Sequence, residues 1–203
     1  DKGHRHVYDS VIKDCKAGKP VVSVGGLAGT GKSVLVGHLL EAMSNWACCA
    51  YTGKAADVLR RKGCSNARTI HSLIYAPYRN RFGQLKFKLK PSIDVNGIIV
   101  DEASMVGGWE FRDMQSFGVP ILLVGDHGQL PPIKGNVDII MHPDYRLEKI
   151  HRNAGEIAYF CHHIRSGHPA HTFRSEKRVR FIRRKDVTPR NIEKIDQVIC
   201  GRN

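Results

Sequence analysis

Apolar and polar positions along the chain follow two periods, and together they predict strands that alternate with helices. Four short, continuous apolar runs are typical of strands buried in a parallel sheet. These runs occupy residues 20–25, 46–51, 97–100 and 120–125. Other segments repeat apolar residues at helical spacing. Helices are therefore expected at residues 5–17, from the end of a glycine-rich turn to about residue 45, from about residue 56, at 69–74 and at 154–166. Thr69 is expected to cap the helix at 69–74.

Residues 78–90 have a different pattern, in which apolar and basic residues alternate. From Leu85 to Lys90 the alternation has the period of two that a β-strand requires, and residues 82–84 before it form a turn signal. The segment predicts a β-hairpin with five basic side chains, no acidic one and Phe82 near its tip. Such a surface suits single-stranded nucleic acid or the end of a duplex. The alternative is a solvated hairpin whose lysines protect a sheet edge from pairing.

The first predicted strand runs directly into a glycine-rich turn. Residues 26–33 read Gly-Leu-Ala-Gly-Thr-Gly-Lys-Ser, and a helical pattern follows at once. Glycines let successive backbone N–H groups converge on one point, and the positive end of the new helix faces the same point. This arrangement holds the phosphates of a nucleoside triphosphate, with Lys32 reaching the β- and γ-phosphates and the Ser33 hydroxyl binding Mg²⁺. The candidate contacts are Gly26, Gly29, Thr30, Gly31, Lys32 and Ser33.

Two carboxylates, Asp101 and Glu102, follow the third apolar run. An aspartate at the carboxyl end of a strand next to the glycine-rich turn would supply a second ligand for Mg²⁺. Glu102 would then orient or deprotonate the attacking water, which favours hydrolysis over transfer to an acceptor. Asp126 and Gln129 follow the fourth run and should face the nucleotide, because ligands of open α/β sheets bind outside the carboxyl ends of the strands.

The composition narrows the class of protein. Among 203 residues, 32 Lys and Arg against 19 Asp and Glu leave a formal charge of +13, so nucleic acid is the first partner to consider. No apolar run approaches the roughly 18 residues of a membrane-spanning helix, and the polar N-terminus does not resemble a signal peptide. The six cysteines contain no C-x-x-C pair, which favours a reducing cytosol. Residues 161–163, Cys-His-His, lie on a predicted helix and point in different directions, which argues against zinc.

Six short segments occur in a fixed order along the chain. They are Gly-Leu-Ala-Gly-Thr-Gly-Lys-Ser at 26–33, Tyr-Thr-Gly-Lys-Ala-Ala at 51–56, Thr-Ile-His-Ser-Leu at 69–73, Val-Asp-Glu-Ala-Ser at 100–104, Val-Gly-Asp-His-Gly-Gln-Leu-Pro-Pro at 124–132 and Ile-His-Arg at 150–152. In this order they resemble motifs I, Ia, Ib, II, III and IV of the superfamily 1 helicases, most closely the RecD-like/Dda-like branch. The resemblance covers about residues 5–203, and its specificity lies in the combination.

The resemblance implies an α/β fold, namely a RecA-like P-loop NTPase domain whose parallel sheet is flanked by helices, with a small inserted β-hairpin. The RecA-like domain would comprise residues 1–77 and 96–190, and the basic, pin-like insertion residues 78–95. Residues 191–203 would begin a second RecA-like domain, which in this family carries motifs V and VI. The chain is therefore expected to be one half of a motor. Because it lacks a starting Met, it is expected to begin inside a longer protein or after processing.

The resemblance also implies roles for individual residues, with ATP and Mg²⁺ as cofactors. Ser33 and Asp101 would hold the metal, and His4 falls where the family has a glutamine that reads adenine. The catalytic residues would be Lys32, Glu102, Gln129 and Arg152. Thr52, Lys54, Thr69 and His71 match positions that line the path of single-stranded DNA. The hairpin would add Arg79, Arg81, Phe82, Lys86 and Lys88.

Together these features predict an ATP-dependent DNA helicase motor domain that moves 5′→3′ on single-stranded DNA. Its partners would be single-stranded DNA, duplex junctions and proteins of replication or recombination, with no membrane. Its location would be the cytoplasm, in association with the nucleoid. The alternatives are an RNA-directed superfamily 1 helicase and a nucleic-acid-binding module with weak ATPase activity. The presence of Lys32, Asp101 and Glu102 argues against the second alternative.

Overall fold

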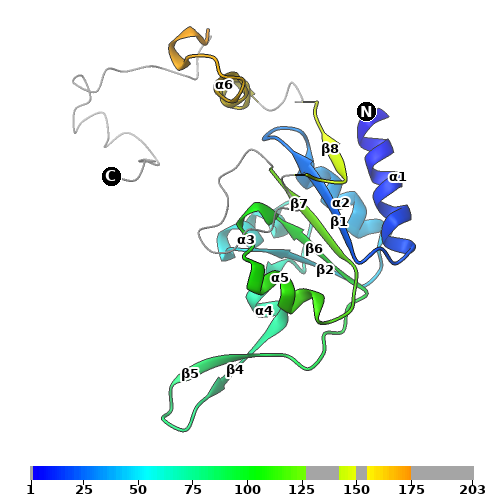
Figure 1. Cartoon of the computed structure of the whole chain (residues 1–203), viewed down its shortest axis with the longest axis vertical. Coiled ribbons are helices and arrows are strands. Elements are labelled where there is room, and N and C mark those ends of the chain that lie inside the picture. The colour runs from blue at the N-terminus through cyan, green and yellow to red at the C-terminus, as the bar shows by residue number, and fades with distance from the viewer. Residues whose placement is uncertain (1, 127–141, 150–154, 175–203) are drawn as a thin grey trace, which may run out of the picture. The chain divides into compact units, whose positions relative to one another are not determined.

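A computed structural model describes residues 2–126, 142–149 and 155–174 of the chain (Figure 1). The chain divides into two compact units, residues 1–154 and 155–203. Residues 191–203, which were expected to begin a second RecA-like domain, lie outside the described residues.

A six-stranded parallel sheet forms the centre of the first unit (Figure 1). Its strands are β1 (Val21–Gly26), β2 (Trp46–Ala50), β3 (Arg68–Thr69), β6 (Gly97–Asp101), β7 (Ile121–Gly125) and β8 (Tyr145–Leu147). Their order across the sheet is β3-β2-β6-β7-β1-β8. The four predicted strands are confirmed as β1, β2, β6 and β7. Strands β3 and β8 were not predicted, because strands this short carry too few residues for an apolar pattern.

Helices cover both faces of the sheet, as strands buried on both sides require. The helices of the first unit are α1 (Lys2–Lys16), α2 (Lys32–Ala42), α3 (Gly53–Arg61), α4 (Ile70–Ile74) and α5 (Gly108–Gln115). Val22 and Val24 of β1 share one core with α1, α2 and α3. Ile98 and Val100 of β6 share the other core with α4 and α5. Helix α5 was not predicted.

The carboxyl ends of the parallel strands meet at one edge of the sheet. The register places Ala50 at the end of β2 between Asp101 on one side and Thr69 on the other. The expectation that Asp101 ends a strand next to the glycine-rich turn is wrong, because β7 lies between β1 and β6. Asp101 nevertheless lines the same cavity as the turn, since α2, which follows the turn, packs across β7 and β6.

One carboxylate fastens the edge strand β8 to β1. Asp144 accepts hydrogen bonds from the backbone N–H and the hydroxyl of Ser23, both at 2.8 Å, and from the Lys19 ammonium at 2.7 Å. Burial alone raises the pKa of Asp144, but the three donors outweigh it and lower that pKa below its ordinary value. The carboxylate therefore stabilises the fold above the ordinary pKa of aspartate, and this contribution is lost as the pH falls through the lowered pKa.

The predicted hairpin is present, and it begins at residue 75 rather than at residue 78. Strand β4 (Tyr75–Arg79) pairs antiparallel with β5 (Leu85–Leu89). The Asn80 N–H donates to the Gln84 carbonyl at 3.0 Å, and Gly83 has a φ of 74°, which favours glycine. The turn expected at residues 82–84 is thus confirmed, and the hairpin projects away from the sheet (Figure 1).

Two contacts fasten the base of the hairpin to the helices beneath it. The Lys90 ammonium donates to the carbonyls of Ser72 and Leu73, at 3.0 and 2.6 Å, near the end of α4. The Tyr75 hydroxyl donates to the carboxylate of Asp113 on α5. The hairpin therefore joins the domain through side chains as well as through its two chain connections.

The second unit contains α6 (Gly155–Arg165), close to the predicted helix 154–166, and a short 3-10 helix, Ala170–Thr172. Phe173 packs against Phe160 with ring centroids 5.3 Å apart. Within the described parts of the chain, no three His, Cys, Asp or Glu side chains form a group suited to a metal ion. None of the described helices has both the length and the apolar character needed to cross a membrane.

Gly97 begins β6 directly against a tryptophan ring, and a Cβ added there would lie 2.5 Å from the Cε2 atom of Trp46. Gly97→Ala is expected to lower the free energy of unfolding by about 1–3 kcal/mol, because the ring or the strand must move. Gly37→Ala is the control, since the space around this α2 residue is open and alanine forms helix better than glycine by about 0.5–1 kcal/mol. Urea unfolding measures both, and equal effects would contradict the close packing at Gly97.

Candidate functional site

The backbone of the glycine-rich turn between β1 and α2 takes a conformation that needs glycine. Gly29 and Gly31 have φ values of 82° and 86°, in the left-handed region. Thr30 between them is buried and donates its hydroxyl to the Leu27 carbonyl at 2.8 Å. A Cβ on Gly26 would lie only 2.6 Å from that hydroxyl oxygen. Three of the predicted glycines therefore have a structural reason to be there.

Lys32 begins α2 and folds back over the turn. Its ammonium donates to the carbonyls of Gly26 and Leu27 at 2.7 and 3.0 Å. The N-cap residue of α2 is Gly31, which offers no side chain to the first N–H groups of the helix. N–H groups without a side-chain cap, the positive end of the helix dipole and an ammonium together form a site for an anion.

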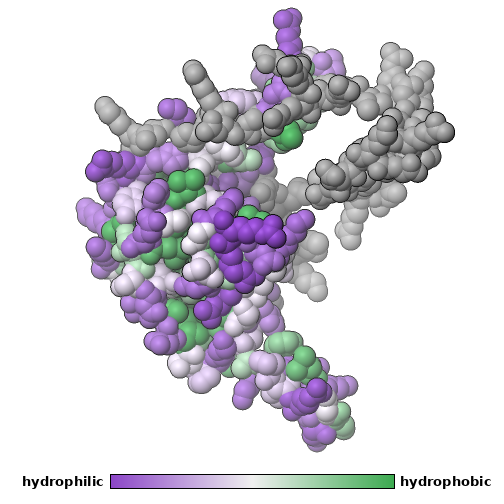
Figure 2. Space-filling model, turned by 180° about the vertical axis from the view of Figure 1, so that it is seen from behind, coloured by the Kyte–Doolittle hydropathy of each residue, from purple (hydrophilic) through white to green (hydrophobic). Residues whose placement is uncertain are grey.

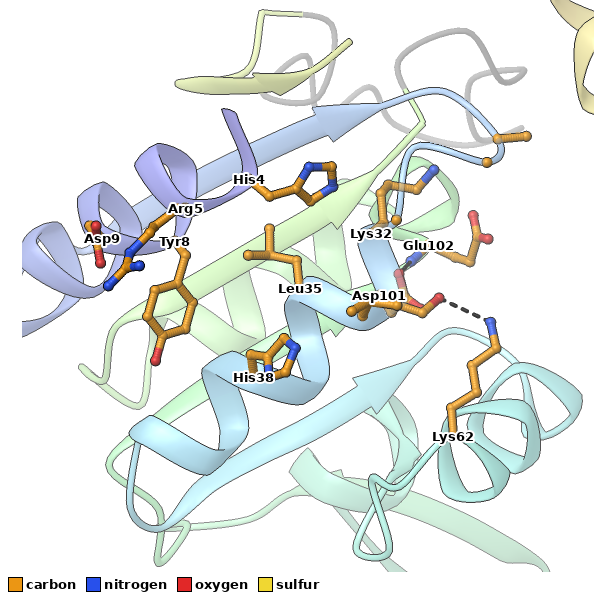
Figure 3. A pocket seen from close by; sticks show the side chains of 15 residues that line it. His4, Arg5, Tyr8, Asp9, Lys32, Leu35, His38, Lys62, Asp101 and Glu102 are labelled. Carbon is orange, nitrogen blue, oxygen red and sulfur yellow. Dashed lines mark hydrogen bonds between the residues drawn. The ribbon is translucent and has the colours of Figure 1, made fainter. Parts of the chain in front are cut away.

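Asp101 and Glu102 form a carboxylate pair at the end of β6. Asp101 is only 8% exposed, and its Oδ1 accepts the Glu102 N–H at 3.0 Å. Glu102 has a φ of 55°, which is uncommon for a residue with a side chain and is often found at functional sites. Successive side chains of a strand point to opposite faces, but this bend brings both carboxylates to one cavity wall (Figure 3).

The carboxylate pair is electrostatically costly. Burial is the main cause that raises the pKa of Asp101 above its ordinary value, and the charge of Glu102 adds to it. The Glu102 N–H and the ammonium groups of Lys32 and Lys62 act in the opposite direction without cancelling the rise. Two carboxylates that share a site in this way suit a divalent cation, which prefers oxygen ligands.

A cavity of about 1180 Å³ brings the turn and the carboxylate pair together. This volume is ample for a nucleoside triphosphate. Figure 3 shows side chains from α1, α2, the end of α3 and the end of β6 around it. The labelled residues that line it are His4, Arg5, Tyr8, Asp9, Lys32, Leu35, His38, Lys62, Asp101 and Glu102.

His4, expected at the adenine position, lies on this cavity wall, and its Nε2 is 2.6 Å from the Thr30 carbonyl. Contact with a base stays a prediction. Arg5, Tyr8 and Asp9 line the same wall, although the sequence analysis did not single them out. Their spacing of three and four residues on a predicted helix was the available signal.

Lys62 is a further site residue that the sequence pattern did not indicate. It directly follows α3, and its ammonium donates to the Ser33 hydroxyl at 3.1 Å. Lys62 stands in a run of basic residues with Arg60 and Arg61, which looks like an ordinary helix end in the sequence. Only the folded chain shows which of the three reaches the cavity.

Two of the predicted nucleic-acid contacts are helix caps. Thr52 Oγ1 accepts the Ala55 N–H at 3.2 Å at the start of α3, and Thr69 Oγ1 accepts the Ser72 N–H at 3.1 Å at the start of α4. The cap predicted at Thr69 is thus confirmed. A hydroxyl that accepts one hydrogen bond keeps its own proton to donate, so a cap and a contact with DNA are compatible. Lys54 is exposed beside Thr52.

The other predicted nucleic-acid contacts lie on or against the hairpin. The His71 ring touches Tyr75 and Phe87, with centroids 4.4 and 4.7 Å apart. Arg81 lies over the ring of Phe82, which is 72% exposed. The remaining exposed cations are Arg79, Lys86 and Lys88. Figure 2 shows apolar and hydrophilic side chains mixed along the projecting hairpin.

Two of the predicted catalytic residues, Gln129 and Arg152, lie outside the described residues, so their positions stay predictions. Asp126 directly follows β7 and is buried, with 1% exposure. Its expected place near the nucleotide also stays a prediction.

The strand order, the glycine-rich turn with Lys32 and the carboxylate pair define the first unit as a P-loop NTPase domain of RecA-like fold. Comparison with known proteins assigns the chain to a family. The profile of the AAA domain family matches residues 9–186, and the chain belongs to this family.

The curated relatives confirm the resemblance to superfamily 1 helicases of the RecD-like/Dda-like branch. The chain is 32% identical to the ATP-dependent RecD2 DNA helicase of Deinococcus radiodurans, over 76% of this chain and 22% of that protein. It is 28% identical to the ATP-dependent DNA helicase dda of Enterobacteria phage T4, over 66% of this chain and 33% of that protein. The chain thus spans between about a fifth and a third of these relatives.

Solved helicase structures share the fold. The Pif1 helicase from Candida albicans superposes with a TM-score of 0.57 at 20% identity, over 82% of this chain and 43% of that chain. The Bacteroides Pif1 helicase in complex with ADP-AlF3 and ssDNA gives a TM-score of 0.54 at 21% identity, over 78% and 45%. At such identities the likeness concerns the fold alone, and it confirms the RecA-like architecture.

Asp101→Asn should separate stability from ligand binding. A carboxyl whose pKa is raised on folding favours the folded state below its ordinary pKa, and that contribution is lost as the pH rises through the raised pKa. At pH 7 a neutral amide of the same shape removes the free-energy cost of burying the ionised carboxylate. We expect Asp101→Asn to melt at the same or a higher temperature than the wild type in EDTA, yet to bind Mg²⁺ and a triphosphate more weakly. Thermal melts and nucleotide titrations measure this, and a clear drop in melting temperature would contradict it.

Proposed function

We propose that this protein is the ATP-hydrolysing motor domain of a DNA helicase that moves 5′→3′ on single-stranded DNA. The observation that carries the proposal is the single cavity that holds both the Lys32–Ser33 turn and the Asp101–Glu102 pair. The relatives support it, since they are ATP-dependent DNA helicases. This chain spans only about a fifth to a third of these relatives, so unwinding belongs to the whole protein and the first RecA-like domain supplies the ATPase site.

The residues at the turn fit ATP and Mg²⁺. The Ser33 hydroxyl and the Asp101 carboxylate are oxygen ligands of the kind that Mg²⁺ prefers, and both line the cavity. Mg²⁺ bound there neutralises charge on the terminal phosphates. The N–H groups at the start of α2 donate hydrogen bonds to the phosphate oxygens. The Lys32 ammonium replaces its hydrogen bonds to the carbonyls of Gly26 and Leu27 with hydrogen bonds to the β- and γ-phosphates.

Glu102 is the proposed general base. The hydrogen bond from the Glu102 N–H to the Asp101 carboxylate and the left-handed backbone of Glu102 hold the two carboxylates at fixed relative positions. Glu102 accepts the proton of the attacking water, and Asp101 would be a ligand of the metal ion. Gln129 and Arg152 are the proposed contacts with the γ-phosphate.

Single-stranded DNA is the proposed track. The exposed residues Thr52, Lys54 and His71 and the half-buried Thr69 lie at or just beyond the carboxyl ends of β2 and β3. The hairpin adds cations and the exposed ring of Phe82. Cations that follow the phosphate backbone, together with a ring on which bases stack, are the usual means of binding single strands. The further proposed partners are duplex junctions and proteins of replication or recombination. The proposed location is the cytoplasm, in association with the nucleoid.

Glu102→Gln tests the enzymatic part of this proposal. We expect a loss of about 100-fold or more in ATP turnover with nucleotide binding retained, because the amide keeps the shape but cannot accept the proton. Lys32→Ala should lose both turnover and binding. The control is Glu110→Gln on α5, a similar partly buried residue that does not line the cavity. Steady-state hydrolysis and a nucleotide titration give the two readouts.

The same hydrolysis assay can also contradict the proposed function. Turnover that survives Glu102→Gln would leave only a binding module, which is the alternative function. Hydrolysis that does not rise with single-stranded DNA at any salt concentration would remove the motor role. Competition between DNA and RNA oligomers of equal length separates the RNA-directed alternative, because a site that reads the 2′-OH prefers RNA.

Phe82→Ala tests the hairpin. Removing a ring on which a base stacks costs about 1–3 kcal/mol, so affinity for single-stranded DNA should fall by roughly tenfold. Trp109→Ala is a matched control, because Trp109 is 71% exposed and also carries an arginine, Arg112, over its ring, but it lies on α5. Fluorescence anisotropy with a labelled oligonucleotide measures both, and equal losses would show that exposed aromatics bind DNA without regard to the hairpin.

A further inference from the structure

Lys62 brings a second ammonium to the phosphate side of the cavity. Its Nζ donates to the Ser33 hydroxyl at 3.1 Å, and Ser33 immediately follows Lys32 in the glycine-rich turn. The charge of Lys62 also acts on Asp101, where it helps to lower a pKa that burial raises. Figure 3 shows the Lys62 side chain extending from the end of α3 toward the region of Asp101, whereas the Lys32 side chain, at the start of α2, lies over the glycine-rich turn. Lys62 therefore contacts Ser33 and lines the same cavity as Asp101, which are the two proposed metal ligands.

The backbone fixes the place from which Lys62 reaches the cavity. It caps the C-terminus of α3, and its N–H donates to the carbonyls of Val58 and Leu59 at 3.1 and 3.0 Å. Gly63 follows with a φ of 103°, and the Cys64 N–H bonds back to the Leu59 carbonyl at 3.1 Å. Cys64 is then buried in the core with 4% exposure. This hydrogen-bonded, glycine-terminated helix end gives the side chain a defined origin.

The partner of Lys62 leaves its charge available to a ligand. The Ser33 hydroxyl is neutral, whereas the nearby Arg60 is paired with the carboxylate of Asp57. A hydroxyl has two lone pairs, so Ser33 can accept from Lys62 and still offer an oxygen lone pair to a cation. The contact is thus compatible with the metal role proposed for Ser33.

We propose that Lys62 is a further nucleotide-binding residue, whose ammonium binds the terminal phosphates of ATP from the end of α3. This inference rests on the proposed function, since it places a ligand in the same cavity. A charge-assisted hydrogen bond to phosphate is stronger than one between neutral groups. Lys62 is exposed, so solvent screens part of the effect. Lys32 and Lys62 together would hold the triphosphate from two separately anchored elements.

The test is binding rather than turnover. We would titrate the 203-residue chain with a fluorescent, non-hydrolysable ATP analogue in Mg²⁺ and again in EDTA. Lys62→Met should weaken binding by about tenfold in both conditions, because the contact is made to phosphate itself. Lys62→Arg should recover most of the affinity. The control is Arg61→Met, which removes one exposed positive charge from the last turn of α3, outside the cavity wall, and should bind like the wild type.

A second titration identifies the part of the ligand that Lys62 contacts. Inorganic triphosphate displaces the analogue through its phosphates alone. Lys62→Met should therefore weaken inorganic triphosphate by about the same factor as the ATP analogue, roughly tenfold. A loss for the analogue with none for inorganic triphosphate would overturn the assignment to phosphate.

The remaining outcomes separate this inference from the proposed function. If the wild type binds, Lys32→Ala does not, and Lys62→Met binds as tightly as Arg61→Met, Lys62 has no part in binding and only this inference fails. If the wild type and Lys32→Ala fail alike to bind the analogue, the proposed function fails as well. Circular dichroism melts check folding, and Lys62→Arg keeps the test decisive if Lys62→Met melts early.

Discussion

Backbone hydrogen bonds between parallel strands decide where the reactive side chains of this domain lie. One register row carries Ala50 between Asp101 and Thr69, so residues far apart in the chain end at the same edge of the sheet. The glycine-rich turn leaves β1 at that edge, two strands away from Asp101. Parallel strands that point one way therefore bring the phosphate site, the carboxylate pair and the helix caps to one edge of the sheet.

The collected charges would be unfavourable without a ligand to balance them. Asp101 is buried beside Glu102, which raises its pKa, and the two ammonium groups of Lys32 and Lys62 relieve the conflict only in part. The left-handed backbone of Glu102 adds local strain at the same place. Strongly perturbed carboxyl groups of this kind cluster at functional sites, and the proposed binding of a cation and a polyphosphate here would offset the cost.

Helix α3 connects the two sides of the proposed chemistry. It begins at Thr52, whose hydroxyl caps it at the sheet edge, and it ends at Lys62 against Ser33. Its nine residues span about 13 Å. The hairpin has a similar link, because Tyr75 bonds Asp113 of α5, the helix that follows the carboxylate pair. These links would connect the proposed nucleotide site with the proposed nucleic-acid contacts.

Local pattern accounts for much of this domain. The four apolar strands, the glycine-rich turn, the cap at Thr69 and the hairpin follow from residue types at fixed spacing, because each depends on neighbours in the chain. Strand order does not. Contacts between distant segments decide three further features. Strand β7 separates β1 from β6, Asp144 holds the edge strand β8, and Lys62 rather than Arg61 reaches the cavity. Periodicity states which face of an element is buried, but packing alone decides which other element covers it.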